Sequence, residues 1–268
     1  MDVDQIICKS LEYPRSSWGK VATLGVILIV PFLVLFLLVI LGALTNNAAV
    51  TAIMAILGIF LAIIAKIVIS GYLFRVIKAT IAGMDDLPNF DDWGDMIVGG
   101  LKVIVVYFVY GIIFGIVAAI PIGIVILLLA LSGSLSTAAT LTEPLAVFGA
   151  GLFVWVMYLS IFIVYLIMLV LGVLYAISVP MAIANMAYMG NIGSAFAFSV
   201  LRQKIESIRW GKAIIWVIAN YFVFIIAVLI SYILGLLLVG IILVPLLVIP
   251  FLALFYNRSI GLLYRNDE

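Results

Sequence analysis

Long hydrophobic stretches alternate with short polar segments along this chain. Twelve of the thirteen Lys and Arg residues fall into four clusters, and the segments between successive clusters carry only two charged residues, Lys66 and Glu143. Each of these segments is long enough to cross a bilayer twice. The pattern therefore predicts three transmembrane hairpins, with six spans at about residues 21–45, 48–74, 102–131, 146–179, 213–235 and 238–257.

The basic clusters also predict which way the hairpins cross the membrane. Positively charged residues stay on the cytoplasmic side of a bilayer, so we expect both termini and both long loops in the cytoplasm. This orientation describes a multi-pass protein of the cell membrane. The clusters consist of Lys9, Arg15 and Lys20; Arg75, Lys78 and Lys102; Arg202, Lys204, Arg209 and Lys212; and Arg258 and Arg265.

The composition supports a membrane protein and excludes several other classes. With 68% hydrophobic residues, 9% charged residues and a mean hydropathy of +1.46, the chain lacks the roughly one-quarter charged residues of a soluble domain. The net charge of +1 gives no sign of a nucleic-acid partner. The chain has no histidine and one cysteine, Cys8, which leaves no basis for a transition-metal site or His-based catalysis. We therefore expect no metal and no cofactor, with the lipid bilayer as the main partner.

A segment of mixed polarity precedes each predicted hairpin. Residues 3–11 and 89–101 are short examples, whereas residues 191–209 separate an apolar line from a polar face at helical spacing. Such a helix lies flat on a membrane surface, where its basic residues can reach anionic lipids. The predicted fold class is all-α integral membrane, with a cytoplasmic interfacial segment before each hairpin. The third segment is expected to make its interfacial contact through Phe198, Leu201, Arg202, Ile205, Ile208 and Arg209.

Five aspartates gather in the loop between the second and third predicted spans. An EF-hand loop needs a glutamate at position twelve, and counting from Asn89 places Gly100 there, so this calcium motif fails. We expect instead that Asn89 caps a helix and that the carboxylates favour its N-terminus and face nearby basic residues. Partner docking and a loose divalent-cation site are the alternatives. The candidate functional positions here are Asp85, Asp86, Asp91, Asp92, Trp93 and Asp95.

Lys66 is the one ionisable residue deep within a predicted span. It lies nine residues before Arg75, which corresponds to roughly 13 Å along a helix. A charge at this depth is a functional hypothesis, in this case the binding of an anionic group. The favoured interpretation is structural: the flexible stem carries the ammonium towards the headgroups, or it contacts a neighbouring helix.

Small residues recur at four-residue spacing in the third predicted span. Such a line lets a second helix approach closely, so that dispersion contacts and weak hydrogen bonds hold the pair. Packing within the chain is the favoured use, and oligomer contact and pore lining are the alternatives. For the chain as a whole, a second copy or another membrane protein is the protein partner that the residues leave open. The line consists of Gly111, Gly115, Ala119 and Gly123.

Several short strings together resemble a known family. They are Glu12-Tyr13-Pro14, Gly71-Tyr72 followed by Arg75, and the loop string from Leu87 to Gly94, which reads Leu-Pro-x-Phe-x-Asp-Trp-Gly and leads to Gly100-Leu101-Lys102. The chain is similar over nearly its whole length to a mostly archaeal integral-membrane family known only as a domain of unknown function. The resemblance implies a polytopic helical fold and implies no activity, cofactor or site residue.

The residues leave two function classes open. A non-enzymatic protein that organises the membrane or scaffolds partners is favoured, because interfacial segments on one leaflet favour curvature and lipid contact. The alternative is a small transporter or channel for an uncharged or apolar solute, which the repeated hairpins suggest. An enzyme is disfavoured, because no paired catalytic groups are recognisable and only the aspartate loop could serve.

Overall fold

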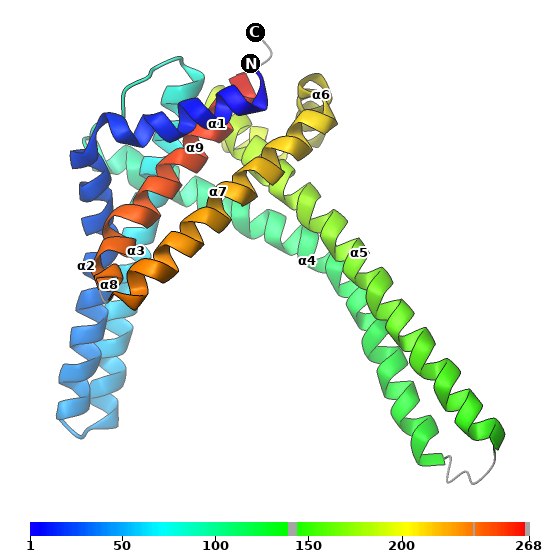
Figure 1. Ribbon diagram of the computed structural model, residues 1–268. Helices are drawn as coiled ribbons and strands as arrows, with labels where there is room; N and C mark the ends of the chain where they lie inside the picture. Colours follow the sequence, from blue (N-terminus) through cyan, green and yellow to red (C-terminus); the bar gives the residue numbers. More distant parts are fainter. Residues whose placement is uncertain (139–143, 238, 266–268) are drawn as a thin grey trace. The chain divides into compact units, whose positions relative to one another are not determined.

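The computed structural model describes residues 1–138, 144–237 and 239–265, and in these ranges helices account for all of the regular secondary structure and no strand occurs. Six of its helices are long and apolar enough to cross a membrane, which confirms an all-α integral membrane fold (Figure 1). The elements are α1 (Val3–Glu12), η1 (Tyr13–Ser16), α2 (Trp18–Leu44), α3 (Ala48–Ile81), α4 (Trp93–Ala138), α5 (Pro144–Met189), η2 (Ile192–Phe196), α6 (Phe198–Ile208), α7 (Trp210–Leu236), α8 (Gly240–Leu243), η3 (Val244–Val248) and α9 (Ile249–Arg265).

The helices extend beyond several of the predicted spans. Helix α5 runs through Pro180 to Met189, although the sequence predicts a span that ends at residue 179. A proline inside a helix costs about 3 kcal/mol, but the residues on both sides of Pro180 are buried and this packing holds the helix together. Helix α3 likewise continues to Ile81, seven residues past the predicted span.

The chain divides into two compact units, which are described separately. Unit 1 consists of Met1–Tyr107 and Ser178–Glu268, and unit 2 is the long hairpin Phe108–Ile177. Unit 1 therefore contains both chain termini, the aspartate loop and four of the apolar helices, together with the first turns of α4 and the last turns of α5.

Two tight hairpins build unit 1. Between α2 and α3, the Asn47 side chain accepts hydrogen bonds from the backbone N–H groups of Ala49 and Val50 and so caps α3. In the same hairpin a Cβ on Gly42 would lie 2.7 Å from the Cα of Thr51, so the two backbones are in close contact. Helix α7 turns back into α8 and α9 at Gly240, which contacts the backbone of Leu234.

Helices α3 and α4 cross where both carry glycine. A Cβ on Gly71 would overlap the backbone carbonyl of Met96, and a Cβ on Gly100 would overlap the carbonyl of Ile67. The absence of both side chains lets the helix backbones touch, as in other membrane helix pairs. This crossing fixes the start of α4 against α3 on either side of the aspartate loop.

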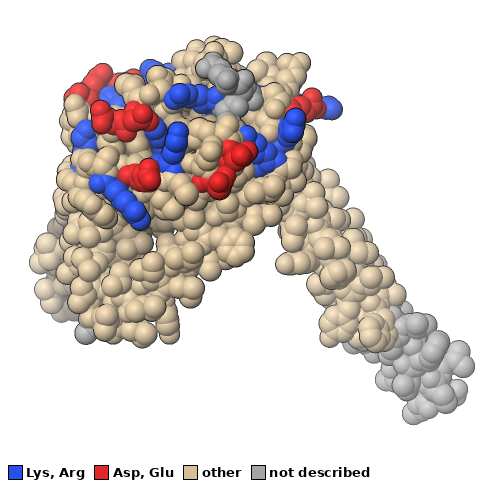
Figure 2. All heavy atoms as spheres, turned by 45° about the horizontal axis from the view of Figure 1, so that its top comes forward, with Lys and Arg blue, Asp and Glu red and all other residues tan. Residues whose placement is uncertain are grey.

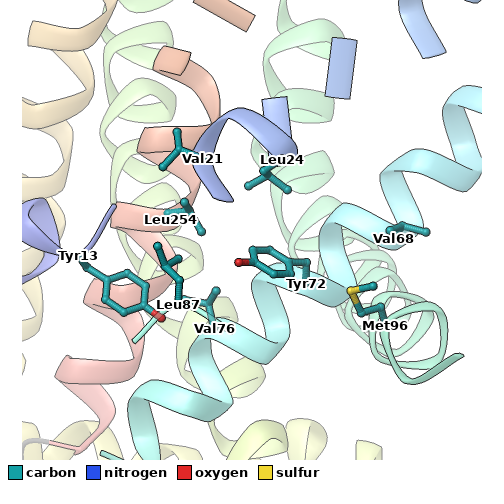
Figure 3. Close-up of a cluster of buried hydrophobic side chains, with 9 residues drawn as sticks. All are labelled: Tyr13, Val21, Leu24, Val68, Tyr72, Val76, Leu87, Met96 and Leu254. Carbon is teal, nitrogen blue, oxygen red and sulfur yellow. The ribbon is translucent and has the colours of Figure 1, made fainter. Parts of the chain in front are cut away.

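The core of unit 1 joins five elements and the aspartate loop (Figure 3). Tyr72 and Val76 of α3 lie at its centre, and Leu87 of the loop packs beside them with 3% of its surface exposed. Each large apolar side chain buried in this way favours folding through the tight packing of its neighbours. The cluster consists of Tyr13, Val21, Leu24, Val68, Tyr72, Val76, Leu87, Met96 and Leu254.

The amphipathic helix α6 packs against its own protein, which corrects the predicted lipid contact. Leu201, Ile205 and Ile208 are each only 4% exposed, and α6 contacts α7 and α9. Only Phe198 of the predicted apolar line is exposed. The segment is also not one helix, because residues 192–196 form a separate 3₁₀ turn. Arg202 pairs with Glu206 one turn further along at 2.8 Å on the outer face, and Arg209 follows the helix as its C-cap.

Unit 2 pairs the remaining parts of α4 and α5. The rings of Phe114 and Tyr175 meet edge to face, with centroids 5.2 Å apart. The line of small residues does not contribute to this pairing: Gly111, Gly115, Ala119 and Gly123 are exposed, and a Cβ on any of the three glycines would meet no atom within 4 Å. The predicted packing within the hairpin is therefore not observed, and contact with another chain stays a prediction.

Candidate functional site at the polar end of unit 1

The charged side chains of unit 1 gather at one end. Figure 2 shows Lys, Arg, Asp and Glu over this end, whereas the visible surface of the helices of unit 1 below shows only uncharged residues. We call this region the polar end and define it as α1, the loop of residues 82–92, and α6. It contains most of the candidate site residues predicted from the sequence.

Arg75 of α3 holds the second half of the loop. Its Nη1 donates to the carbonyl oxygens of Asn89 (3.2 Å) and Asp91 (2.7 Å), and it pairs with the Asp91 carboxylate at 2.9 Å. Its Nη2 donates to the carbonyl oxygen of Asp92 at 3.0 Å and lies 3.4 Å from the carboxylate of Asp95. Because its donors form a rigid fork, one guanidinium fixes the loop onto the first turn of α4.

Arg258 of α9 holds the first half of the loop. The residue is 4% exposed, and its Nη1 donates to the carbonyl oxygen of Met84 at 2.6 Å and to the Thr80 hydroxyl at 3.2 Å. Its Nη2 pairs with the Asp85 carboxylate, and the guanidinium stacks 4.4 Å from the centre of the Tyr13 ring. A buried positive charge is thus neutralised by a carboxylate whose side chain is 89% exposed.

Two tyrosines and a lysine bind the middle of the loop. Tyr72 donates to the carbonyl oxygen of Pro88 at 3.0 Å, and its ring stacks on Phe90 with centroids 4.1 Å apart. Tyr13 donates to the carbonyl oxygen of Asp86 at 3.2 Å, and Lys20 donates to that of Leu87. All three hydrogen bonds go to carbonyl oxygens of the loop backbone, which explains how an apolar Leu and a Pro are held in a polar loop.

Burial raises the pKa of Tyr13 to about 12, while the positive charge of Arg258 acts in the opposite direction. Removing the solvent disfavours the charged phenolate, and this effect exceeds the attraction of the nearby guanidinium. The phenol therefore stays protonated at neutral pH and remains a hydrogen-bond donor to the loop.

Asp92 caps α4, which corrects the predicted role of Asn89. The helix begins at Trp93, and the backbone N–H of Asp95 donates to the Asp92 carboxylate at 3.4 Å. Asp92 has a φ of 49°, a conformation that Asp tolerates better than most residues. Asn89 lies before this cap and gives its carbonyl oxygen to Arg75. Trp93 is half exposed in the first turn.

The carboxylates of Asp85, Asp91, Asp92 and Asp95 do not converge, and Asp86 bonds to Tyr13 through its backbone carbonyl oxygen. Asp85 faces Arg258, Asp91 and Asp95 face Arg75, and Asp92 caps the helix. Among the described residues no group of three His, Cys, Asp or Glu side chains could hold a metal ion. The divalent-cation alternative therefore has no ligand cluster, and the contacts favour the structural interpretation of the loop.

The remaining predicted position, Lys66, lies outside the polar end. It is exposed on α3, and within the described ranges no hydrogen bond or ion pair involves it. Lys78 and Lys102 instead line a small cavity of about 60 Å³ beside Arg75 and Asp95. This volume suits an ordered water rather than an organic ligand.

A groove of about 830 Å³ opens at the polar end between α1 and the α6–α7 junction. Asp2 and Asp4 line it from α1, and Arg209 and Lys212 line it from the junction. Arg209 has a φ of 73°, in the left-handed region where most side chains are strained. Sequence patterns did not identify this groove, because its walls lie some two hundred positions apart.

Sequence reasoning also missed most of the residues that hold the loop. Arg75 was expected to face the aspartates, but Arg258, Tyr13, Tyr72 and Lys20 were not connected with them. One signal was available for Tyr13 and Tyr72, since both belong to the strings that carry the family resemblance. No sequence signal connected Arg258 with the loop, because it lies 173 positions from Asp85.

The fold and the polar end define a polytopic α-helical membrane protein whose loop between the second and third spans is fixed by two arginines. A family model described as a protein of unknown function (DUF4013) matches residues 56–239, and the chain belongs to this family. The match confirms the predicted membership in a family of unknown function, and it includes the loop, the α4–α5 hairpin and α6. No curated protein and no solved structure matches the chain.

Proposed function

We propose that this membrane protein is a non-enzymatic scaffold whose polar end binds a segment of a partner protein. The observation that carries this proposal is the groove between α1 and the α6–α7 junction, which is large enough for a short peptide segment. Acidic residues line one wall and basic residues the other, so an extended segment with charges of both signs complements it.

Strain beside the groove supports a binding role. Arg209 retains a left-handed backbone conformation that a glycine or asparagine would adopt more readily. Strained residues of this kind cost about 1–3 kcal/mol and cluster at functional sites. The Arg209 side chain lines the groove, which gives the chain a reason to keep an arginine at this position.

The packing of the amphipathic helices favours scaffolding over bending of the bilayer. A wedge must insert its apolar face among lipids. In α6 that face lies against α7 and α9, and in α1 Ile6 is fully buried. We therefore place the organising activity at the polar end, which the basic clusters assign to the cytoplasm.

Site-specific photocrosslinking in intact cells tests the scaffold. A photoreactive residue at Ser207, which lines the groove, should give a discrete protein adduct, and one at Val200 on the exposed face of α6 should not. The variant Arg209→Asn removes a charge from the groove while keeping a residue that tolerates this φ. It should lose the adduct without losing stability. Equal adducts at Ser207 and Val200, or an adduct that survives Arg209→Asn and Lys212→Glu, would count against the proposal.

A transporter for an uncharged or apolar solute is the second candidate, favoured by a separate apolar groove in unit 1. Purified protein in liposomes loaded with an uncharged solute distinguishes the two functions. If the protein is a scaffold, solute efflux should equal that of loaded liposomes without protein. Protein-dependent efflux that saturates with solute concentration would favour the transporter instead.

A further inference from the structure

An apolar groove of about 400 Å³ runs between α7 and α9 and shares no residue with the groove at the polar end. Ala227 and Ile230 of α7 line one wall, and Val248 and Phe251 line the other. Trp18 and Arg15 close one edge, and Arg15 is the only charged residue among the described residues that line this groove.

The groove has an identifiable structural origin. Helices α7 and α9 are held together on one side by Trp216 and Tyr256, whose stacked rings have centroids 5.9 Å apart, and on the other by the turn at Gly240. Between these contacts α7 presents the small side chain of Ala227. The facing segment is the π-turn η3, which starts beside Pro245 and supplies Val248. A π-turn widens a helix by one residue and frequently occurs at functional sites.

Hydrocarbon is the material that fits this groove. Both helices that form its walls belong to the apolar spans, and Ile230 still exposes 48% of its surface. A water molecule needs two to four polar partners, which the apolar walls do not offer. In a bilayer the groove is therefore filled by a lipid chain or by an apolar side chain of another protein.

The residues at the edge of the groove favour a lipid over an apolar side chain of another protein. Arg15 is exposed, and within the described part of the chain it forms no ion pair. Trp18 stacks on Phe251 with ring centroids 6.1 Å apart. Tryptophan prefers the membrane–water boundary, so it places Arg15 at the depth of the headgroups. We propose that the groove binds one anionic phospholipid, with a hydrocarbon chain along α7 and α9 and its phosphate on Arg15.

Native mass spectrometry of the full-length protein tests the headgroup contact. We expect phosphatidylglycerol to remain bound at detergent concentrations that remove phosphatidylcholine. Arg15→Gln should reduce this preference about fivefold, because one basic residue near the surface contributes roughly that factor to anionic-lipid binding. Lys9→Gln removes an exposed cation of α1 that does not line the groove and should leave the preference unchanged. An unchanged preference in Arg15→Gln, or an equal loss in Lys9→Gln, would overturn the proposal.

Filling the groove tests the chain contact. Ala227→Leu should remove the bound lipid whatever its headgroup, whereas Ala52→Leu, on an exposed position of α3, should retain it. Lipid retained equally by both variants would refute the site. A dimer that dissociates in Ala227→Leu while the lipid stays bound would assign the groove to a second copy of the chain and also overturn the proposal. Arg15→Gln changes an exposed side chain and should not prevent folding. It therefore tests the lipid site even where Ala227→Leu does not fold.

Discussion

Arg258 is the residue on which the aspartate loop depends most. Its guanidinium is buried, so the Asp85 carboxylate neutralises a charge that water hardly reaches. Arg75 depends less on a carboxylate partner, because it is more exposed and also binds three backbone carbonyl oxygens. The two arginines hold the same loop, yet loss of a carboxylate partner should affect them unequally.

Asp85→Asn should lower the free energy of unfolding by about 1.5–3 kcal/mol, the range for hydrogen bonds to charged groups. The neighbouring Asp86→Asn is the matched control, since among the described residues only the backbone carbonyl of Asp86 forms a hydrogen bond, and it should change stability by less than about 0.5 kcal/mol. Unfolding midpoints in detergent measure the stability of both variants. Equal losses in the two variants would show that Asp85 does not neutralise Arg258.

Tyr13 gives the loop a predictable response to alkaline pH. Its folded pKa of about 12 lies above the ordinary value of 10, so its contribution to stability is complete below pH 10 and is lost as the pH rises towards 12. Two pKa units correspond to about 3 kcal/mol. Tyr13→Phe should be about 1 kcal/mol less stable than wild type at pH 9, through the lost hydrogen bond. This deficit should shrink and reverse between pH 10 and 12 in parallel unfolding measurements, and a constant deficit would contradict the assignment.

At the scale of the elements, helix α6 is stabilised by its own protein. Leu201→Ala should cost about 2–4 kcal/mol, as for other buried leucines. Val200→Ala, one position away on the exposed face, is the matched control and should be nearly neutral. Thermal unfolding in detergent would reveal the difference. If both substitutions prove neutral, α6 is not docked and lies on lipid as its sequence pattern predicts.

The crossing of α3 and α4 depends on a glycine that the small-residue pattern did not single out. Gly71→Ala places a methyl group on the Met96 carbonyl, and overpacking of this kind costs about 1–3 kcal/mol. A Cβ at Gly111 or Gly115 meets no atom within 4 Å, so Gly111→Ala and Gly115→Leu should leave the unfolding midpoint unchanged or slightly raised. A lower midpoint for Gly115→Leu together with loss of an oligomer would identify the exposed line as a contact between chains.

The sequence predicted elements better than their contacts. Hydrophobic length determines the spans, and the basic clusters separate them into hairpins, so all six were located. The start of α4 was missed because Asn89 and Asp92 are both good caps, and only the hydrogen bond from the Asp95 N–H to the Asp92 carboxylate distinguishes them. The apolar faces of α1 and α6 were assigned to lipid because an amphipathic pattern is the same whether lipid or protein covers it. The partner of Arg258 depends on packing between distant segments, which no local pattern encodes.

At the scale of the whole molecule, the topology is the central claim. Unit 1 contains both termini, the aspartate loop and α6. From the basic clusters we predict that its polar end faces the cytoplasm. The turn between α2 and α3 should then face the opposite side of the membrane. Cys8 is the natural thiol of the chain and is exposed on α1, so it supplies one probe without substitution.

Labelling of intact cells with a membrane-impermeant maleimide tests this topology most directly. Cys8 in the natural protein, and Gln203→Cys in a Cys8→Ser background, should react only after the membrane is permeabilised. Ala48→Cys in the same background, at the start of α3, should react in intact cells. Labelling of Gln203→Cys and Ala48→Cys from the same side would contradict the three-hairpin topology and remove the polar end from the cytoplasm.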